Sequence, residues 1–238
     1  MSKAEFIRDA KVHENDNGLE IITQNSYGYG DIIRLASYAS KTQKILDMPV
    51  VLKYLVTIDN ISLTKNIKQV LDHYDLDFRY VVEIGSLKNY KHQYTNLLKK
   101  EYAKQVRDVL GCPKLKTKDK PRSHPYIAAW HPYNNLQAVE HDKMPISKSD
   151  FFDALSTNNE VHYIDYRMDI DQVFSTIKNA RLCIGYEGLG QQIAYHYNKQ
   201  ILTLSNWKDV SINTGGPESF IINNTKDLRN FVNDWNIL

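Results

Sequence analysis

The sequence lacks the features of membrane, secreted and zinc-binding proteins. Its 238 residues contain no run of about 18 apolar residues, so we expect no membrane span. The polar amino terminus, residues 1–5, has no apolar signal-peptide core, and we therefore expect a cytoplasmic protein. The two cysteines, Cys112 and Cys183, lie far apart in the sequence and do not form a disulfide framework. The histidines do not have the spacing of metal ligands, so we expect no zinc site.

Glycine is scarce, and its placement is informative. Ile33 occupies the third glycine position of a Gly-x-Gly-x-x-Gly fingerprint, and no Gly-Lys-Ser/Thr of a P-loop occurs, which disfavours those two nucleotide-binding classes. Glycine clusters between strand and helix nevertheless often cradle phosphate or sugar, because the backbone can approach closely. Seven of the ten glycines form three clusters, each after an expected strand: Gly28 and Gly30; Gly185, Gly188 and Gly190; Gly215 and Gly216.

What the sequence does contain is a regular alternation of apolar runs with helical patterns. An apolar fraction of 42% allows a sizeable core, and alternating strands and helices predict parallel sheets covered by helices. The alternation restarts after the charged, proline-containing segment 114–123, which we interpret as a linker. We therefore predict an α/β protein with two Rossmann-like βαβ lobes, residues 1–115 and 123–238, and a ligand cleft between them.

The first glycine cluster places a carboxylate, Asp31, at the start of a helix expected from residue 31 to 46. One interpretation makes Asp31 a general base that accepts a proton from an attacking hydroxyl. The other makes it a helix cap that satisfies free backbone N–H groups. The residues around Asp31 leave both interpretations open.

The second glycine cluster follows the expected strand 182–184 and opens a helix. Free backbone N–H groups at Gly188, Leu189 and Gly190 would face an anion such as a diphosphate. Glu187 would repel phosphate at close range, so we expect its carboxylate to accept hydrogen bonds from a ribose or sugar hydroxyl. The alternative is an acidic residue that merely stabilises a helix start.

Three further residues are candidate ligand contacts in the second lobe. His131 ends its first strand and could donate to a phosphate or sugar oxygen, unless it is a structural histidine. Lys143 lies in the following loop and could contact phosphate as a point charge. Trp207 lies in the long loop after the strand ending at Leu204 and could stack on a nucleobase, unless it is simply a packed aromatic.

Positive charge is concentrated in one segment. Residues 88–122 hold eleven Lys and Arg against three acidic residues, a net charge of +8, so the rest of the chain carries −6. Such a segment is either a solvated helix and linker or a polyanion contact. For a nucleic-acid contact the candidates are Lys99, Lys100, Lys104 and Arg107.

Four motifs in this order resemble the two-lobed GT-B glycosyltransferases, particularly the heptosyltransferase-like family. They are Gly30-Asp31-Ile32-Ile33, Trp130-His131-Pro132, the segment 185–194, and Gly216-Pro217. The third departs from the family pattern Gly-x-Asp-Ser/Thr-Gly-x-x-His. Glu187 replaces the Asp, no Ser/Thr follows it, and Gln191 or Gln192 replaces the His.

The resemblance implies an enzyme that transfers a sugar from a nucleotide-diphosphate sugar to a hydroxyl. It makes Asp31 the base of an inverting reaction in an amino-terminal acceptor lobe. The carboxy-terminal lobe would bind the donor, a UDP-sugar in the first instance, and no metal ion is expected to be required.

The acceptor is the least constrained part of this expectation. Bacteriophage DNA glycosyltransferases also have GT-B folds. This precedent and the basic segment together favour a hydroxymethylated base of phage DNA as the acceptor, and that base would be flipped out of the duplex. A cell-envelope saccharide is the alternative acceptor. Two other classes stay open: a nucleotide-sugar epimerase, with His131 or Glu187 as its second acid or base, and a non-catalytic nucleic-acid-binding protein.

Overall fold

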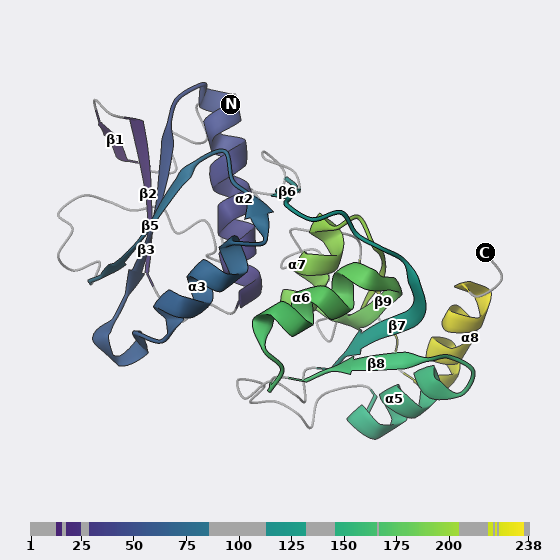
Figure 1. Cartoon of the computed structure of the whole chain (residues 1–238). Helices are drawn as coiled ribbons and strands as arrows, with labels where there is room; N and C mark the ends of the chain where they lie inside the picture. The colour runs from purple at the N-terminus through teal and green to yellow at the C-terminus, as the bar shows by residue number, and fades with distance from the viewer. Residues whose placement is uncertain are drawn as a thin grey trace. The chain divides into compact units, whose positions relative to one another are not determined.

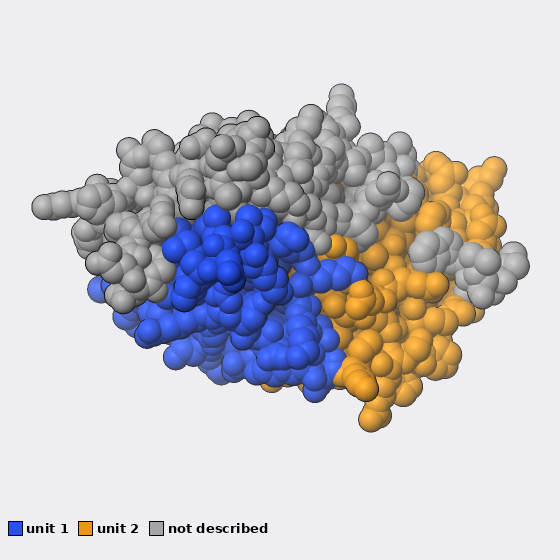
Figure 2. All heavy atoms as spheres, turned by 90° about the horizontal axis from the view of Figure 1, so that it is seen from above, with its two compact units in different colours: residues 1–119 blue, residues 120–238 orange. Residues whose placement is uncertain are grey.

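A computed structural model of the chain forms two compact units, residues 1–119 and 120–238 (Figure 2). The structure describes residues 13–15, 18–24, 29–85, 113–131, 146–165, 167–204, 219–220, 222 and 224–235. Within these ranges, no helix has both the length and the apolar character that a membrane span needs. Each unit is described by itself below.

Unit 1 is built on a four-stranded sheet in the order β1-β2-β3-β5. The strand β1 runs antiparallel to β2, whereas β2, β3 and β5 are parallel. Two helices follow β2 and β3 and lie on the same side of the sheet (Figure 1). The bounds are β1 (His13–Asn15), β2 (Gly18–Gln24), α2 (Tyr29–Leu46), β3 (Val50–Val56), η1 (Ile58–Asn60), α3 (Leu63–Leu71) and β5 (Arg79–Ile84).

The long helix α2 follows the predicted apolar stripe, since Ile32, Leu35, Ala36 and Ala39 are all buried. Burial of such side chains supplies most of the stability of a helix of this kind. One specific bond also joins α2 to the sheet: the hydroxyl of Tyr54 donates to the carbonyl oxygen of Ile32 at 3.0 Å. Because α2 follows β2, its first turn is anchored next to the carboxyl ends of the parallel strands.

Unit 2 contains an all-parallel five-stranded sheet in the order β11-β10-β9-β7-β8. The helices α6 and α7 cover one face, and α5 and α8 cover the other (Figure 1). The bounds are β7 (His124–Trp130), α5 (Lys148–Ser156), β8 (Val161–Ile164), α6 (Ile170–Asn179), β9 (Ala180–Tyr186), α7 (Leu189–His196), β10 (Gln200–Leu204), β11 (Ser219–Phe220) and α8 (Thr225–Trp235).

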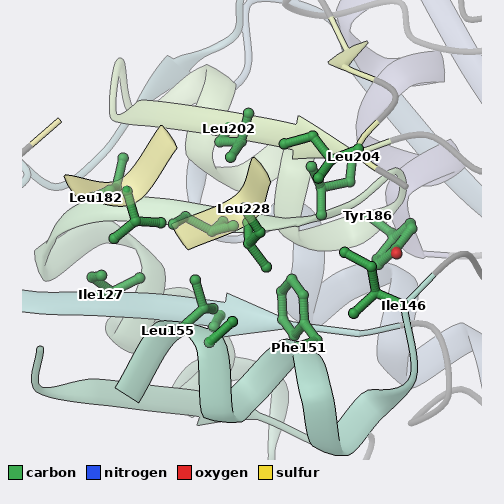
Figure 3. Close-up of a cluster of buried hydrophobic side chains, with 14 residues drawn as sticks. Ile127, Ile146, Phe151, Leu155, Leu182, Tyr186, Leu202, Leu204 and Leu228 are labelled. Atoms are coloured by element: carbon green, nitrogen blue, oxygen red, sulfur yellow. The ribbon is translucent and has the colours of Figure 1, made fainter. Parts of the chain in front are cut away.

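A hydrophobic cluster fills the space between the sheet of unit 2 and the helices α5 and α8 (Figure 3). Phe151 and Leu155 of α5 meet Leu182 of β9 and Leu228 of α8, and all four are at most 2% exposed. Figure 3 also shows Tyr186 beside Ile146 at the end of the cluster toward which the strand arrows point. The core therefore extends to the carboxyl ends of the strands.

The predicted fold class is confirmed, and the differences from the sequence-based expectation are local. The helix α2 begins at Tyr29 and not at residue 31, so Gly30 stands inside its first turn and not before it, whereas Asp31 lies in the first turn as predicted. The predicted linker 114–123 includes the short strand β6 (Lys116–Thr117), which pairs with β4 (Tyr74–Asp75) of unit 1. The ammonium of Lys116 and the carboxylate of Asp75 lie 2.6 Å apart, an attraction that the sequence pattern did not reveal. The helix expected at about 90–110 lies outside the described residues.

Candidate functional site

The strand order of unit 2 contains one reversal, between β7 and β9. From β7 the chain passes to β8 on one side, and from β8 it returns through α6 to β9 on the other side. In open parallel sheets, ligands bind at the carboxyl ends of the strands where the order reverses. Here that position brings Trp130 and His131, at the end of β7, beside the segment 186–190, which comprises the end of β9, the connecting residues 187–188 and the start of α7.

Gly188 has a backbone conformation that favours glycine strongly. Its φ of 138° and ψ of −148° lie in a region that side chains with a Cβ avoid. A Cβ added at Gly188 would meet no atom within 4 Å, so the position is open rather than crowded. The conformation lets the chain turn sharply from β9 into α7, and the space where a side chain at position 188 would stand is open.

The other two glycines of this cluster have a packing role. A Cβ at Gly185 would overlap the Cε2 and Cδ2 atoms of the Trp130 indole, and a Cβ at Gly190 would lie 2.5 Å from the same Cδ2 atom. The indole therefore contacts both the end of β9 and the start of α7. The predicted role of Gly190 in donor binding stays a prediction, while close packing is what the structure shows.

Gln191, in the first turn of α7, was named in the sequence only as a replacement for a family histidine. It is 1% exposed, and among the described residues its Nε2 atom has no hydrogen-bond partner. A buried donor without an acceptor costs about 1–3 kcal/mol, so a bound acceptor would be favoured here.

Glu187 and Leu189 flank Gly188 in the turn. The backbone N–H of Glu187 donates to the carbonyl oxygen of Leu204 at 3.2 Å, so the turn is tied to the end of β10 as well as to β9. Glu187 and Leu189 are half-buried, whereas Gly188 is exposed. A carboxylate at this place can accept hydrogen bonds from ligand hydroxyls while the amides of the next residues face an anion.

His131 lies in the core next to this turn. It is 3% exposed, its Nε2 atom lies 3.1 Å from the carbonyl oxygen of Ile146, and its ring makes an edge contact with Tyr186 at 5.0 Å. These contacts show a structural role at the end of β7. Its predicted contact with a ligand stays a prediction. Burial raises the pKa of the Tyr186 phenol to about 12, so that group stays protonated in this environment.

In unit 1, Asp31 lies in the first turn of α2, at the carboxyl edge of the parallel strands. Arg34, one turn later, donates from Nη2 to Oδ1 of Asp31 at 2.6 Å. The Asp31 side chain is 37% exposed, and the bond from Arg34 uses its Oδ1 atom. Arg34 orients the carboxylate and leaves one oxygen able to accept a proton. Sequence analysis singled out Asp31 but not Arg34, although a spacing of three in a helix was a sufficient signal.

Several predicted site residues fall outside the described part of the chain. They are Lys143, Trp207, Lys99, Lys100, Lys104 and Arg107. Within the described ranges, no group of three or more His, Cys, Asp and Glu side chains is arranged to hold a metal ion. The residues that the structure does bring together are His131, Glu187, Gly188, Leu189 and Gly190, which lie at the end of β7, in the turn after β9 or at the start of α7.

Comparison with known proteins identifies the fold. No family model matches the sequence, and no curated protein matches it. Among solved structures, the chain is similar to the iron-containing dodecameric glycosyltransferase TibC of enterotoxigenic E. coli, with a TM-score of 0.52 at 13% identity over 87% of this chain. A second structure, that of the heptosyltransferase TibC in complex with ADP-D-β-D-heptose, gives the same TM-score, identity and coverage.

The chain spans 63% of the length of TibC. The E. coli heptosyltransferase WaaC with ADP aligns over 90% of this chain and 97% of its own, at 8% identity and a TM-score of 0.42. At these identities the likeness to TibC establishes the fold, which is of the GT-B type.

Proposed function

We propose that this protein is a glycosyltransferase that moves a sugar from a nucleoside-diphosphate sugar to an acceptor hydroxyl. One observation carries the proposal: the strand reversal in unit 2 lies beside an open helix start that holds a buried amide donor, Gln191, which has no hydrogen-bond partner in the described part of the chain. The GT-B fold supports it, and so does the complex of TibC with ADP-D-β-D-heptose.

The donor diphosphate would bind at the first turn of α7. The first bond of this helix runs from the N–H of Gln192 to the carbonyl oxygen of Gly188, at 3.2 Å. The three preceding N–H groups, those of Leu189, Gly190 and Gln191, have no helical acceptor by geometry. Together with the helix dipole they would stabilise the charge that grows on the leaving diphosphate.

Other residues would complete donor recognition. Glu187 would accept hydrogen bonds from sugar or ribose hydroxyls, and His131 and Lys143 would lie near the phosphates. Trp207 would stack on the nucleobase. The helix start supplies the stabilisation that a cation would otherwise give, so the proposed reaction uses the nucleotide sugar alone, with UDP-sugars as the first candidates and ADP-sugars as the second.

Asp31 would act as the base of an inverting displacement. Its Oδ2 atom takes the proton of the acceptor hydroxyl while the hydroxyl oxygen bonds to the anomeric carbon. The bond from that carbon to the diphosphate oxygen breaks, and the nucleoside diphosphate leaves with the electron pair. The proposal requires Asp31 to reach the bound donor during turnover.

A thermal-shift panel with UDP, GDP, ADP and their sugars tests donor binding, because a ligand that binds only the folded state raises the unfolding temperature. We expect at least one nucleoside diphosphate to raise the unfolding temperature, and the corresponding nucleoside to raise it less. No response across the panel would contradict the proposal. Incubation of the chosen donor without acceptor separates the classes, since an epimerised sugar would identify an epimerase.

For the acceptor we propose duplex DNA with hydroxymethylated bases, supported by the +8 charge of residues 88–122. Lys118, Lys120 and Arg122, in the described part of this segment, are exposed. Duplex binding should then weaken steeply with salt, with a slope set by the number of phosphates contacted. Labelled sugar should appear on hydroxymethylated DNA; transfer only to a cell-envelope saccharide would exclude DNA as the acceptor.

A further inference from the structure

Trp130 links the two sides of the proposed phosphate-binding turn. It is the last residue of β7, it is 9% exposed, and its Nε1–H donates to the carbonyl oxygen of Tyr186 at 2.6 Å. Tyr186 is the residue at which β9 ends and the turn begins. The bond therefore fixes the first side of the turn.

The indole ring fixes the second side. It occupies the space that side chains at Gly185 and Gly190 would need, so it packs against β9 with one part and against the first turn of α7 with another. Gly190 is the second residue of α7. The ring thus sets how closely the helix start approaches the strand.

The N-cap position of α7 gives no such support. The N-cap residue, Gly188, has no side chain to bond the helix start, and a Cβ there would touch nothing. The contrast with α6 is direct, because Asp169 and Gln172 form a complete capping box at the start of that helix. The start of α7 is held instead by Trp130 and by the backbone bond from Glu187 to Leu204.

We propose that Trp130 is a positioning residue for donor-phosphate binding, which holds the free amides of α7 at the spacing a diphosphate needs. This inference rests on the proposed function. Preorganised amides bind an anion without first losing conformational freedom, so loosening them lowers affinity. The effect should be confined to the phosphates and should not reach the nucleoside.

The test compares Trp130→Phe with a matched control, Tyr126→Phe. Tyr126 lies on the same strand and also donates to a backbone carbonyl, that of Thr176 at 2.9 Å. Titration calorimetry with inorganic pyrophosphate, UDP and ADP, and with uridine and adenosine, gives the dissociation constants. Trp130→Phe should raise those of pyrophosphate and of the bound diphosphate about tenfold, the size of one lost positioned hydrogen bond, and leave the nucleosides unchanged.

Three outcomes distinguish the claims. If Trp130→Phe and Tyr126→Phe lower the unfolding temperature alike and bind pyrophosphate like the wild type, Trp130 is only structural and the inference is wrong. If the wild type binds neither pyrophosphate nor any nucleoside diphosphate, the proposed function fails and takes the inference with it. A diphosphate-specific loss in Trp130→Phe alone supports both.

A second variant guards against unfolding. Benzothienylalanine at position 130 keeps the bicyclic ring and lacks the N–H donor, so it tests the bond to Tyr186 without emptying the space at Gly190. We expect it to weaken pyrophosphate binding while the unfolding temperature stays close to that of the wild type. Unchanged pyrophosphate binding in this variant would show that the bond does not position the turn.

Discussion

At the scale of single residues, the sequence singled out Asp31 correctly as a helix-start carboxylate, but it did not reveal how that carboxylate is held. Arg34 fixes one oxygen of Asp31 at 2.6 Å. A cap would use its oxygens on the helix amides, whereas this carboxylate bonds a side chain and is partly exposed. The arrangement is compatible with a base and explains how its orientation is kept.

Asp31→Asn should remove turnover and spare donor binding. The amide keeps the shape of the side chain but cannot take a proton, so we expect kcat to fall by about 10²–10⁴-fold. The dissociation constant of the nucleotide should not change, because the proposed donor site belongs to unit 2. Steady-state kinetics and calorimetry measure the two quantities.

The control is Asp77→Asn. The Asp77 carboxylate pairs with Lys44 at 2.9 Å, near the opposite end of α2, and is similarly exposed. Lys44 and a bond from Ser40 lower the pKa of Asp77 against the opposing effect of burial. Replacing the Asp77 carboxylate by an amide should leave kcat unchanged. Wild-type turnover in Asp31→Asn would show that Asp31 is not the base.

Tyr186→Phe should make the protein more stable at high pH. Burial raises the pKa of Tyr186 to about 12, whereas an exposed tyrosine titrates near 10. The unfolded chain therefore loses this proton first, and the stabilisation present below pH 10 is lost as the pH rises toward 12. Removing the hydroxyl removes this contribution.

Chemical unfolding of the wild type and of Tyr186→Phe between pH 8 and 11 measures the effect. The variant should lose less stability with pH, although Cys183, whose pKa burial raises to about 12, keeps part of the slope. Within the described residues the Tyr186 hydroxyl has no hydrogen-bond partner, so at pH 8 its removal should cost nothing. If the stability of the wild type and of Tyr186→Phe fell equally with pH, the raised pKa of Tyr186 would be contradicted.

At the scale of elements, the glycine cluster after β9 combines two functions that sequence reasoning treated as one. The sequence predicted the strand, the turn and the helix, and it placed them in the correct order. It could not show that Gly185 and Gly190 make room for Trp130, because that contact joins residues 55 or more positions apart in the chain. Gly188 alone has the open, glycine-favouring conformation that the ligand interpretation assumed.

Gly188→Ala should destabilise the turn without any clash. The conformation at φ 138° costs a residue with a Cβ about 1–3 kcal/mol, and relaxation of that strain would move the helix amides. We expect a lower unfolding temperature and weaker pyrophosphate binding, as measured by thermal unfolding and calorimetry. Gly85→Ala is the control, since its Cβ would lie at an ordinary 3.7 Å from Leu55 and no positive φ is involved. If Gly188→Ala and Gly85→Ala had the same unfolding temperature and the same affinity for pyrophosphate, the proposed strain at position 188 would be contradicted.

At the scale of the whole molecule, the alternation of strands and helices was enough to predict two α/β lobes with parallel sheets. The strand order was not readable, because periodicity reports which residues are buried and not which strand lies beside which. That order is what places β7 next to β9 and so brings His131 to the Glu187 turn. The pairing of β6 with β4 and the antiparallel strand β1 were missed for the same reason.

The most direct measurement is a crystal structure of the protein with UDP or ADP bound, whichever raises the unfolding temperature more. We predict that diphosphate oxygens lie within about 2.7–3.2 Å of the backbone nitrogens of Leu189, Gly190 and Gln191, with the Gln191 amide as a further donor. A diphosphate bound anywhere else in the protein, with the start of α7 empty, would contradict it.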